Sequence, residues 1–352
     1  MKKEKVVIVT LYDSINCGTF LQAFSLGEYI KNIGFEPVYL HLKNDNTSVN
    51  NKSVTIKKSS NKQLFIKAIR KIMLKIKFSK MMKYFKLIDL DEVNNDESIK
   101  YVIIGSDEIW NVNNDSFTHY DEFFGYNFKN KKIITYAPSC NDITKDDIKR
   151  YNGNLDFEMF ECLSARDKNT FNLLSDFGFK NITMVLDPTF LSNCYMTKMS
   201  DVKLKNYIIV YGHNFTDEQV SIIKKIAAKL NKKLVSITKY YDWCDKNIIA
   251  SPFEFLSYIK NADYIITSTF HGSVFSIIFE KNFICFVKSK NKVSDLLEKF
   301  ELQDRIFNDA DSGLNLLNEN INYAKVNELK KKYLEESVEY LCNSLDVEKK
   351  NE

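Results

Sequence analysis

Residues 5–42 read KVVIVTLYDSINCGTFLQAFSLGEYIKNIGFEPVYLHL, and this stretch sets the fold class. It begins with a continuous apolar run at 5–10, as expected for a buried parallel strand. After a polar loop at 13–18, apolar residues recur at helical spacing up to Gly34, a residue type that commonly follows a helix end. A second strand is predicted at 37–42. A strand, a helix and a strand in this order open a Rossmann-like domain.

The same alternation continues and predicts a second domain. Further strands are expected at 163–165 and 182–186, and a new series begins near Asn206. In that series, Ser251-Pro252-Phe253-Glu254 has the features of a capping box with Pro at the first helical position. We expect an α/β protein with two Rossmann-like domains facing a cleft. The expected parts are an N-terminal domain at 1–195 with a basic helical insertion at 43–98, a second domain at 205–312 and a C-terminal helix at 320–348.

Composition narrows the class of protein. The chain is 44% hydrophobic with only 10 Gly and 4 Pro, which argues against a low-complexity or fibrous protein. Its seven Cys form no C-x-x-C pair, which favours a reducing compartment and argues against a zinc site. The apolar run after the N-terminal lysines is predicted to be a strand and not a signal peptide, and no segment is long enough to span a bilayer. We expect a cytoplasmic protein without a bound metal.

The charge of the chain is concentrated in one stretch. Residues 57–88 contain ten Lys, one Arg and no acidic residue, whereas the net charge of the whole chain is only +4. Two apolar rows at helical spacing accompany these charges: Leu64, Ala68, Ile72, Ile76 and Phe65, Ile69, Met73. Such a helix can lie on the inner face of a membrane, or its apolar rows can pack on the first domain. No nucleic-acid motif accompanies it, so nucleic-acid binding is not expected.

Polar clusters follow several predicted strands, at the edge where open α/β sheets bind ligands. The residues are Asn16, Gly18, Ser106, Asp107, Arg166, Ser268, Thr269, His271 and Gly272. We expect His271 to lie in a loop before a helix at 273–280, either as an acid–base group or as a ring that only hydrogen-bonds the loop. Arg166 can bind phosphate or carboxylate, or pair with Asp167 at the surface.

The other members of these clusters have simpler interpretations too. Asp107 is a candidate base or a helix N-cap, and Asn16 with Gly18 can line a ligand or form an ordinary turn. Trp110 fits a core better than a ligand platform. The phosphate-binding patterns G-x-x-x-x-G-K and G-x-G-x-x-G are absent, which argues against a nucleotide triphosphate or dinucleotide ligand.

In chain order, five segments resemble the motifs of the polysaccharide pyruvyl transferase family, with the last of the S-F-H-G type. They are NCGTFLQAF at 16–24, IGSDEIWN at 104–111, LSARD at 163–167, VLDPT at 185–189 and TSTFHGSVFS at 267–276. The resemblance implies a GT-B-like fold and transfer of pyruvate from phosphoenolpyruvate, with no further cofactor, to a sugar of a polysaccharide or its lipid-linked precursor. It implies that His271 is the general acid or a phosphate ligand and that Arg166 binds the donor.

The resemblance also implies that Asp107 is the base and that Asn16 and Gly18 line the site. One position departs from the pattern, because many members carry Arg two residues before the His and this chain has Thr269. A lost Arg removes a charge-assisted contact of about 1.5–3 kcal/mol. Two alternatives therefore stay open: a GT-B glycosyltransferase that uses a nucleotide sugar, and a non-catalytic protein of polysaccharide assembly.

Overall fold

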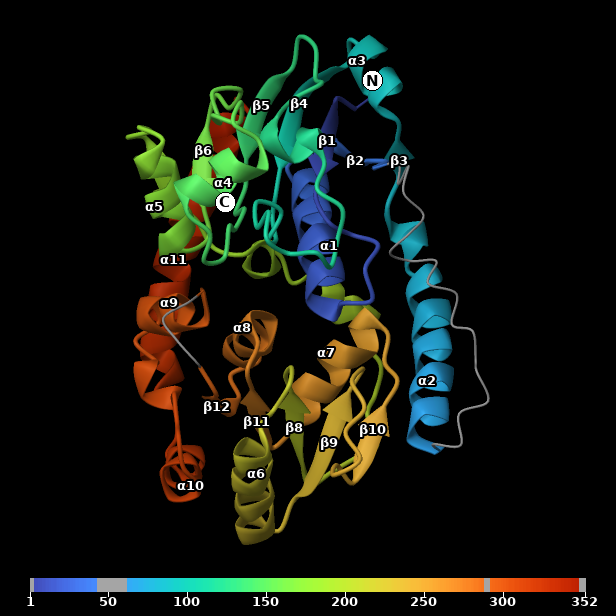
Figure 1. The fold of residues 1–352 in the computed structure, drawn as a ribbon, viewed down its shortest axis with the longest axis vertical. Coiled ribbons are helices and arrows are strands. Elements are labelled where there is room, and N and C mark those ends of the chain that lie inside the picture. Colours follow the sequence, from blue (N-terminus) through green and yellow to red (C-terminus); the bar gives the residue numbers. More distant parts are fainter. Residues whose placement is uncertain (1–2, 43–61, 288–291, 348–352) are drawn as a thin grey trace. The chain divides into compact units, whose positions relative to one another are not determined.

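A computed structural model describes residues 3–42, 62–287 and 292–347. The chain divides into two compact units. The first unit is made of Met1–Lys58, Met81–Cys194 and Lys332–Glu352, and the second is made of Ser59–Lys80 and Tyr195–Lys331. Each unit is built around its own parallel sheet, as the alternation of strands and helices in the sequence predicts (Figure 1).

The first unit has a five-stranded sheet in the order β3-β2-β1-β4-β5. Its strands are β1 (Lys5–Val9), β2 (Glu36–Leu40), β3 (Leu87–Ile88), β4 (Ile99–Ile104) and β5 (Lys132–Thr135). Two further strands, β6 (Leu163–Ala165) and β7 (Ile182–Met184), pair in parallel with each other. The helices are α1 (Cys17–Asn32), α3 (Leu90–Asn95), α4 (Lys145–Tyr151) and α5 (Lys168–Asp176), and the later part of α11 (Tyr323–Ser344) also belongs to this unit.

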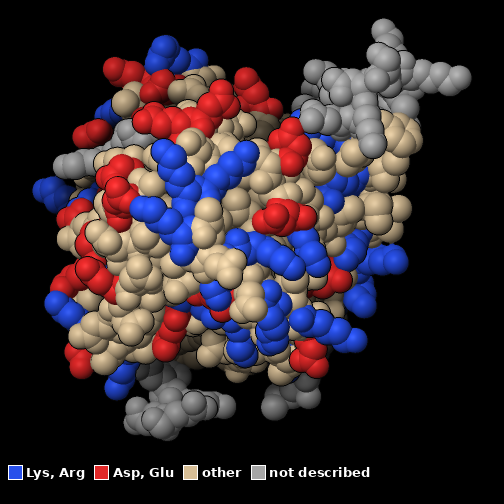
Figure 2. Space-filling model, turned by 90° about the horizontal axis from the view of Figure 1, so that it is seen from below, with Lys and Arg blue, Asp and Glu red and all other residues tan. Residues whose placement is uncertain are grey.

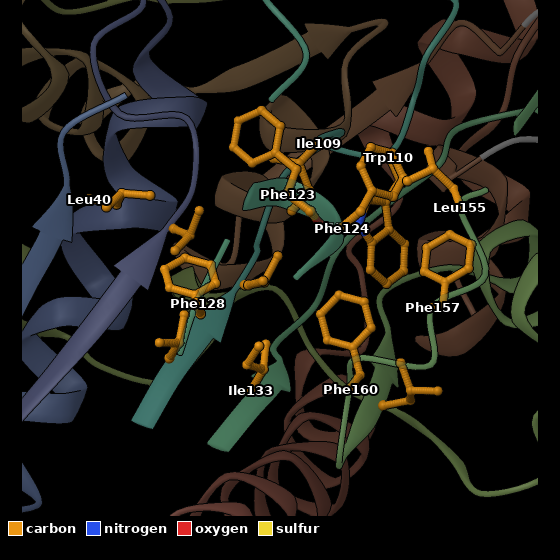
Figure 3. Close-up of a cluster of buried hydrophobic side chains, with 14 of the residues drawn as sticks. Leu40, Ile109, Trp110, Phe123, Phe124, Phe128, Ile133, Leu155, Phe157 and Phe160 are labelled. Carbon is orange, nitrogen blue, oxygen red and sulfur yellow. Dashed lines mark hydrogen bonds between the residues drawn. The ribbon is translucent and has the colours of Figure 1, made fainter. Parts of the chain in front are cut away.

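The core of the first unit is aromatic and includes Trp110. Its indole is fully buried, donates a hydrogen bond from Nε1 to the carbonyl of Phe123 at 2.7 Å, and packs edge-on against Phe157 (Figure 3). Large aromatic side chains in such positions contribute about 3–5 kcal/mol each, measured by truncation to Ala. Trp110 is therefore a core residue, as the sequence predicts.

The second unit repeats this arrangement. Its sheet has the order β10-β9-β8-β11-β12, and every pair in it is parallel. The strands are β8 (Tyr207–Tyr211), β9 (Lys233–Ile237), β10 (Lys246–Ile248), β11 (Tyr264–Thr267) and β12 (Asn282–Cys285). The helices are α2 (Lys62–Ser79), α6 (Asp217–Leu230), α7 (Pro252–Asn261), α8 (Phe270–Ile278), α9 (Lys292–Lys299) and α10 (Ala310–Asn318). The predicted capping box is present. The Ser251 side chain accepts from the N–H of Glu254, and the Glu254 side chain accepts from the N–H of Ser251.

The basic stretch differs from the expected single insertion in the first domain. Helix α2 belongs to the second unit, whereas β3 extends the sheet of the first unit. Arg70 of α2 explains the assignment, because its guanidinium donates to the carbonyls of Asn247 and Ile248 on β10. The part of the predicted insertion at 43–61 lies outside the described residues. The C-terminal helix is also shared, since residues from Lys332 onward belong to the first unit.

Three predicted helix boundaries are wrong. Helix α1 begins at Cys17 and α8 at Phe270, so that residues expected in loops form first turns of helices. The physical reason is the same in both, since a polar side chain just before the helix accepts hydrogen bonds from the free N–H groups of the first turn. The sequence also predicts a helix over 145–161, whereas α4 ends at Tyr151 because Asn152 has an extended backbone.

Charges of both signs lie on the face drawn in Figure 2. Lys and Arg side chains gather across the middle of that view, with Asp and Glu between and around them. That face therefore carries no continuous field of one sign. Among the described helices, none is both long enough and apolar enough to cross a membrane.

Candidate functional site

The two sheets share one strand order. Numbered within each unit, both follow 3-2-1-4-5, so the order reverses between β1 and β4 in the first unit and between β8 and β11 in the second. Ligands of open α/β sheets bind outside the carboxyl ends of the strands at such a switch point. The loops that follow these four strands carry most of the polar residues singled out from the sequence.

In the first unit, side chains join the two loops at the switch point. Thr10, after β1, donates from Oγ1 to the carbonyl of Ser106 at 2.9 Å, and Thr19 of α1 donates to the carboxylate of Asp107 at 2.7 Å. Gly105 allows the loop after β4 to turn there, because its φ is +114° and a Cβ would lie 2.3 Å from the carbonyl oxygen of Tyr136. Asp107 has a φ of +77°, a conformation that costs of order 1–3 kcal/mol and is found at functional sites.

Arg166 lies at the end of β6 and is bound by carboxylates. Its Nη1 is 2.8 Å from Oδ2 of Asp187, its Nη2 is 3.9 Å from Oδ1 of Asp107, and the Nη1 also lies 3.4 Å from Oγ of Ser106. The Arg166 side chain is 1% exposed, so it is not the surface feature that one interpretation of the sequence allowed. Nearby, burial and the charge of Asp187 raise the pKa of Tyr136 well above its ordinary value, which keeps this phenol neutral.

Asn16 and Gly18 lie at the start of α1. Oδ1 of Asn16 accepts from the N–H groups of Gly18 and Thr19, so Asn16 is the N-cap. Asn16 is exposed and Gly18 is buried in the first helical turn. The cap places Thr19 where its hydroxyl reaches Asp107, which links α1 to the loop after β4.

In the second unit, three hydroxyl groups order the loop after β11. Thr267 donates from Oγ1 to the carbonyl of Tyr211 at 2.6 Å, and Oγ of Ser268 accepts from the N–H of His213. Thr269 is the N-cap of α8, because its Oγ1 accepts from the N–H of Gly272 at 3.0 Å. Thr269 therefore has a clear local role at the start of this helix.

His271 lies in the first turn of α8 and not in a loop. Its ring is near those of Phe270 and Phe275, and the residue is 8% exposed. Gly272 follows it because a Cβ there would lie 2.1 Å from Oγ1 of Thr267. His271 thus stands at a helix N-terminus, where N–H groups and the helix dipole favour an anion.

His213 was not singled out from the sequence. It follows β8 on the opposite side of the switch point from Ser268. Partial removal of its ring from water lowers its pKa, and the positive charge of Lys239 lowers it further. Its ring is therefore neutral at pH 7 and can act as a proton acceptor. The position of His213 could have identified it from the sequence, because it is a polar residue that closely follows the apolar strand β8.

Each unit therefore gathers its own set of predicted residues. Ser106, Asp107 and Arg166 contact one another in the first unit, with Asn16 and Gly18 attached through α1. Ser268, Thr269, His271 and Gly272 form the second set. Sequence reasoning missed the roles of Thr19, Asp187 and His213. Over the ranges that the structure describes, no group of three or more His, Cys, Asp or Glu is placed to hold a metal ion.

Known structures share this fold. A UDP-N-acetylglucosamine 2-epimerase matches with a TM-score of 0.56 at 10% identity, over 100% of this chain and 99% of that chain. The S. aureus MnaA protein, solved with UDP, matches with a TM-score of 0.52 at 11% identity, over 99% and 98% of the two chains. The UDP-GlcNAc 2-epimerase of Neisseria meningitidis, bound to UDP-GlcNAc, matches with a TM-score of 0.50 at 7% identity, over 97% and 98%.

These likenesses establish the fold alone, which is GT-B-like with parallel sheets, as the sequence predicts. No curated protein matches the sequence. The family model described as polysaccharide pyruvyl transferase matches residues 16–289, a range that includes both switch-point clusters. The chain is therefore a transferase that belongs to the polysaccharide pyruvyl transferase family.

Proposed function

We propose that this protein transfers pyruvate from phosphoenolpyruvate to a saccharide as a ketal. The observation that carries the proposal is that the family match, 16–289, spans two independent polar clusters, each at the switch point of its own sheet. A binding site at that edge is expected for an enzyme of this fold. Phosphoenolpyruvate is a cytoplasmic metabolite, so we place the reaction in the cytoplasm, with no cofactor beyond the donor itself.

The reaction has two steps whose atoms balance. In the first, a sugar hydroxyl adds to the central carbon of the enol phosphate, the methylene carbon gains a proton and becomes a methyl group, and the hydroxyl proton passes to a base. In the second, a neighbouring hydroxyl forms the second C–O bond at the same carbon, its proton is removed, and phosphate leaves. The sum is phosphoenolpyruvate plus a diol, giving a ketal plus inorganic phosphate. Such a path needs a proton donor, a base and positive charge for the donor's anionic groups.

We assign these roles to residues at the two switch points. His271, at the N-terminus of α8, is the proton donor or a phosphate ligand, because the N–H groups and the dipole at that end of the helix favour an anion beside its ring. Asp107 is the base, since its side chain is 12% exposed and its carboxylate accepts a hydrogen bond from Thr19. Arg166 supplies positive charge next to Asp107, with its Nη2 3.9 Å from Oδ1 of that carboxylate. Asn16, Gly18, Ser106, Ser268 and Gly272 shape the loops around these groups.

Thermal stabilisation of the full chain tests the donor. A ligand that binds only the folded state raises the free energy of unfolding by about 2.7 kcal/mol at a hundred times its Kd. We expect phosphoenolpyruvate to raise Tm and UDP-GlcNAc to leave it unchanged, and phosphate to be released when a saccharide acceptor is added. Stabilisation by nucleotide sugars alone would replace the proposal with a glycosyltransferase. Binding of neither donor would favour the non-catalytic alternative.

A further inference from the structure

Helix α2 is fixed to the second unit by one of its faces. Arg70 donates to the carbonyls of Asn247 and Ile248 at 2.8 and 3.1 Å, and Nζ of Lys77 pairs with Glu254 at 2.6 Å. Leu74 and Phe78, on the same face, are buried. Figure 1 shows α2 running beside the edge strand β10, whose carbonyls at Asn247 and Ile248 accept from Arg70. The helix is therefore held firmly, with its other face directed away from the sheet.

That other face is apolar and exposed. Of the ten large hydrophobic side chains that are exposed among the described residues, five lie on α2: Phe65 (50%), Ile69 (39%), Ile72 (41%), Met73 (46%) and Ile76 (51%). Their spacing of four, three, one and three residues keeps them on one side of a helix with 3.6 residues per turn. Exposed apolar patches that are concentrated in this way mark an interaction surface.

Exposed lysines accompany the apolar face on the same helix. Lys67, Lys71 and Lys75 follow one another at intervals of four residues. At 100° per residue, Lys75 lies about 60° from Ile72, at the edge of the apolar face, whereas Lys71 lies about 100° and Lys67 about 140° from it, toward the face that packs on the sheet. No acidic residue occurs at 57–88, so nothing within this stretch balances the charge. The surface therefore combines apolar side chains with positive charge.

This combination selects an anionic lipid surface as the occupant. Two copies of the chain that met through this face would bring two basic helices together, with no acidic residue at 57–88 in either, which opposes a dimer. A bilayer accepts Phe, Ile and Met side chains without matching their shape, and its anionic headgroups complement the lysines. We propose that α2 docks the protein on anionic membranes, with the five apolar side chains at the headgroup–acyl boundary and Lys75, at the edge of that face, among the headgroups.

Co-sedimentation of the full chain with vesicles tests the charge. We expect binding to phosphatidylcholine vesicles that contain phosphatidylglycerol, weak binding to phosphatidylcholine alone, and release at about 1 M salt, where the Debye length is about 3 Å. The triple variant K67Q/K71Q/K75Q should bind at least about fivefold more weakly, since one lysine near the anionic surface contributes about fivefold and Lys75 lies at the edge of the apolar face. The matched control K224Q/K225Q/K233Q removes three exposed lysines from the same unit and should retain binding. Equal losses in the two variants would overturn the proposal.

A second pair of variants tests the apolar face. Ile72→Asn with Ile76→Asn should reduce binding at least about tenfold even at low salt, without lowering Tm, because both side chains are exposed. The fluorescence that the Phe65→Trp substitution adds should be quenched by lipids brominated on their acyl chains. Absence of quenching, or of wild-type binding at low salt, would overturn the proposal. So would a wild-type dimer that these asparagines dissociate, since the face would then be an interface between copies.

Discussion

The guanidinium of Arg166 lies 2.8 Å from the carboxylate of Asp187, 21 residues away in the sequence. The two side chains are 1% and 0% exposed. Asp187 is itself held in place, because its other oxygen accepts from the N–H and the hydroxyl of Thr189. At this burial each charge depends on the other, since an unpaired charge cannot be solvated there.

Replacing Asp187 by Asn should therefore destabilise the fold. The change leaves the Arg166 charge buried without its main partner, and the free energy of unfolding should fall by about 3–5 kcal/mol. Urea unfolding of purified protein measures it. The control is Asp311→Asn, whose partner Lys229 forms an exposed pair, and it should change stability little. Similar losses in both variants would show that the buried pair contributes no more to the free energy of unfolding than the exposed pair does.

Arg166→Lys should weaken donor binding while the protein still folds. Lys retains the charge but loses the planar fork that holds two carboxylates at once. We expect the Kd for phosphoenolpyruvate to rise roughly ten- to a hundredfold, the equivalent of the charge-assisted contact that Lys cannot keep to both Asp187 and Asp107. Isothermal titration gives the Kd, and Arg150→Lys at an exposed position is the control. An unchanged Kd would restrict Arg166 to a purely structural role.

His271→Asn should lower the rate of turnover strongly and the stability of the fold little. The amide retains some hydrogen bonding but cannot transfer a proton, and the loss of rate should be about 10²–10⁴-fold. The initial rate of phosphate release, measured beside Tm, separates the two effects. His41→Asn replaces an exposed His that pairs with Asp89 and should retain the wild-type rate. Near-normal turnover of the His271 variant would remove this residue from the reaction.

Gly272→Ala should destabilise the start of α8. The added Cβ would lie 2.1 Å from Oγ1 of Thr267 and 2.7 Å from Oγ1 of Thr269, so the loop that positions His271 has to move. Overpacking of this kind costs about 1–3 kcal/mol, and activity should fall with it. Thermal unfolding and rate measurements test this prediction. Gly153→Ala meets only one atom, at 3.9 Å, and should be tolerated; equal effects at the two positions would contradict the steric argument.

Stability below neutral pH should depend on Asp96. Its pKa lies well below the ordinary value of 3.8, mainly because Nζ of Lys5 donates to it at 2.7 Å and also because Ser98 does. A carboxyl with a lowered pKa in the folded state stabilises the protein above the unfolded pKa, and this contribution is lost as pH falls. The urea midpoint should therefore fall less between pH 5 and about 2 in Asp96→Asn than in the wild type.

Lys5→Met is the matched partner of that experiment. The pKa of Lys5 is raised by Asp96, so its own contribution is complete at neutral pH and is lost only as pH rises above 10.5. In the acid range the Lys5 variant should lose the same dependence as Asp96→Asn. A wild-type slope in either variant would show that the pair does not govern acid stability.

Local patterns predicted much of each unit. The apolar runs that became β1, β6 and β8 could be found because buried parallel strands are continuous in their apolar character. The capping box at Ser251 was equally visible, since its partners are three residues apart. Helix starts at Cys17 and Phe270 were missed, because Asn16 and Thr269 serve in turns as readily as in caps.

The sequence by itself determined the fold class, the family motifs and the strand ends where polar residues gather. Only the tertiary structure decided the partners, such as Thr19 with Asp107 and Asp187 with Arg166. It also decided that α2 packs on β10 through Arg70 and leaves its apolar face exposed. The physical reason is that the spacing of apolar residues is a local pattern, which shows only which side of a helix or strand is apolar. Which elements become neighbours depends on the strand order, which depends on the packing of the whole unit.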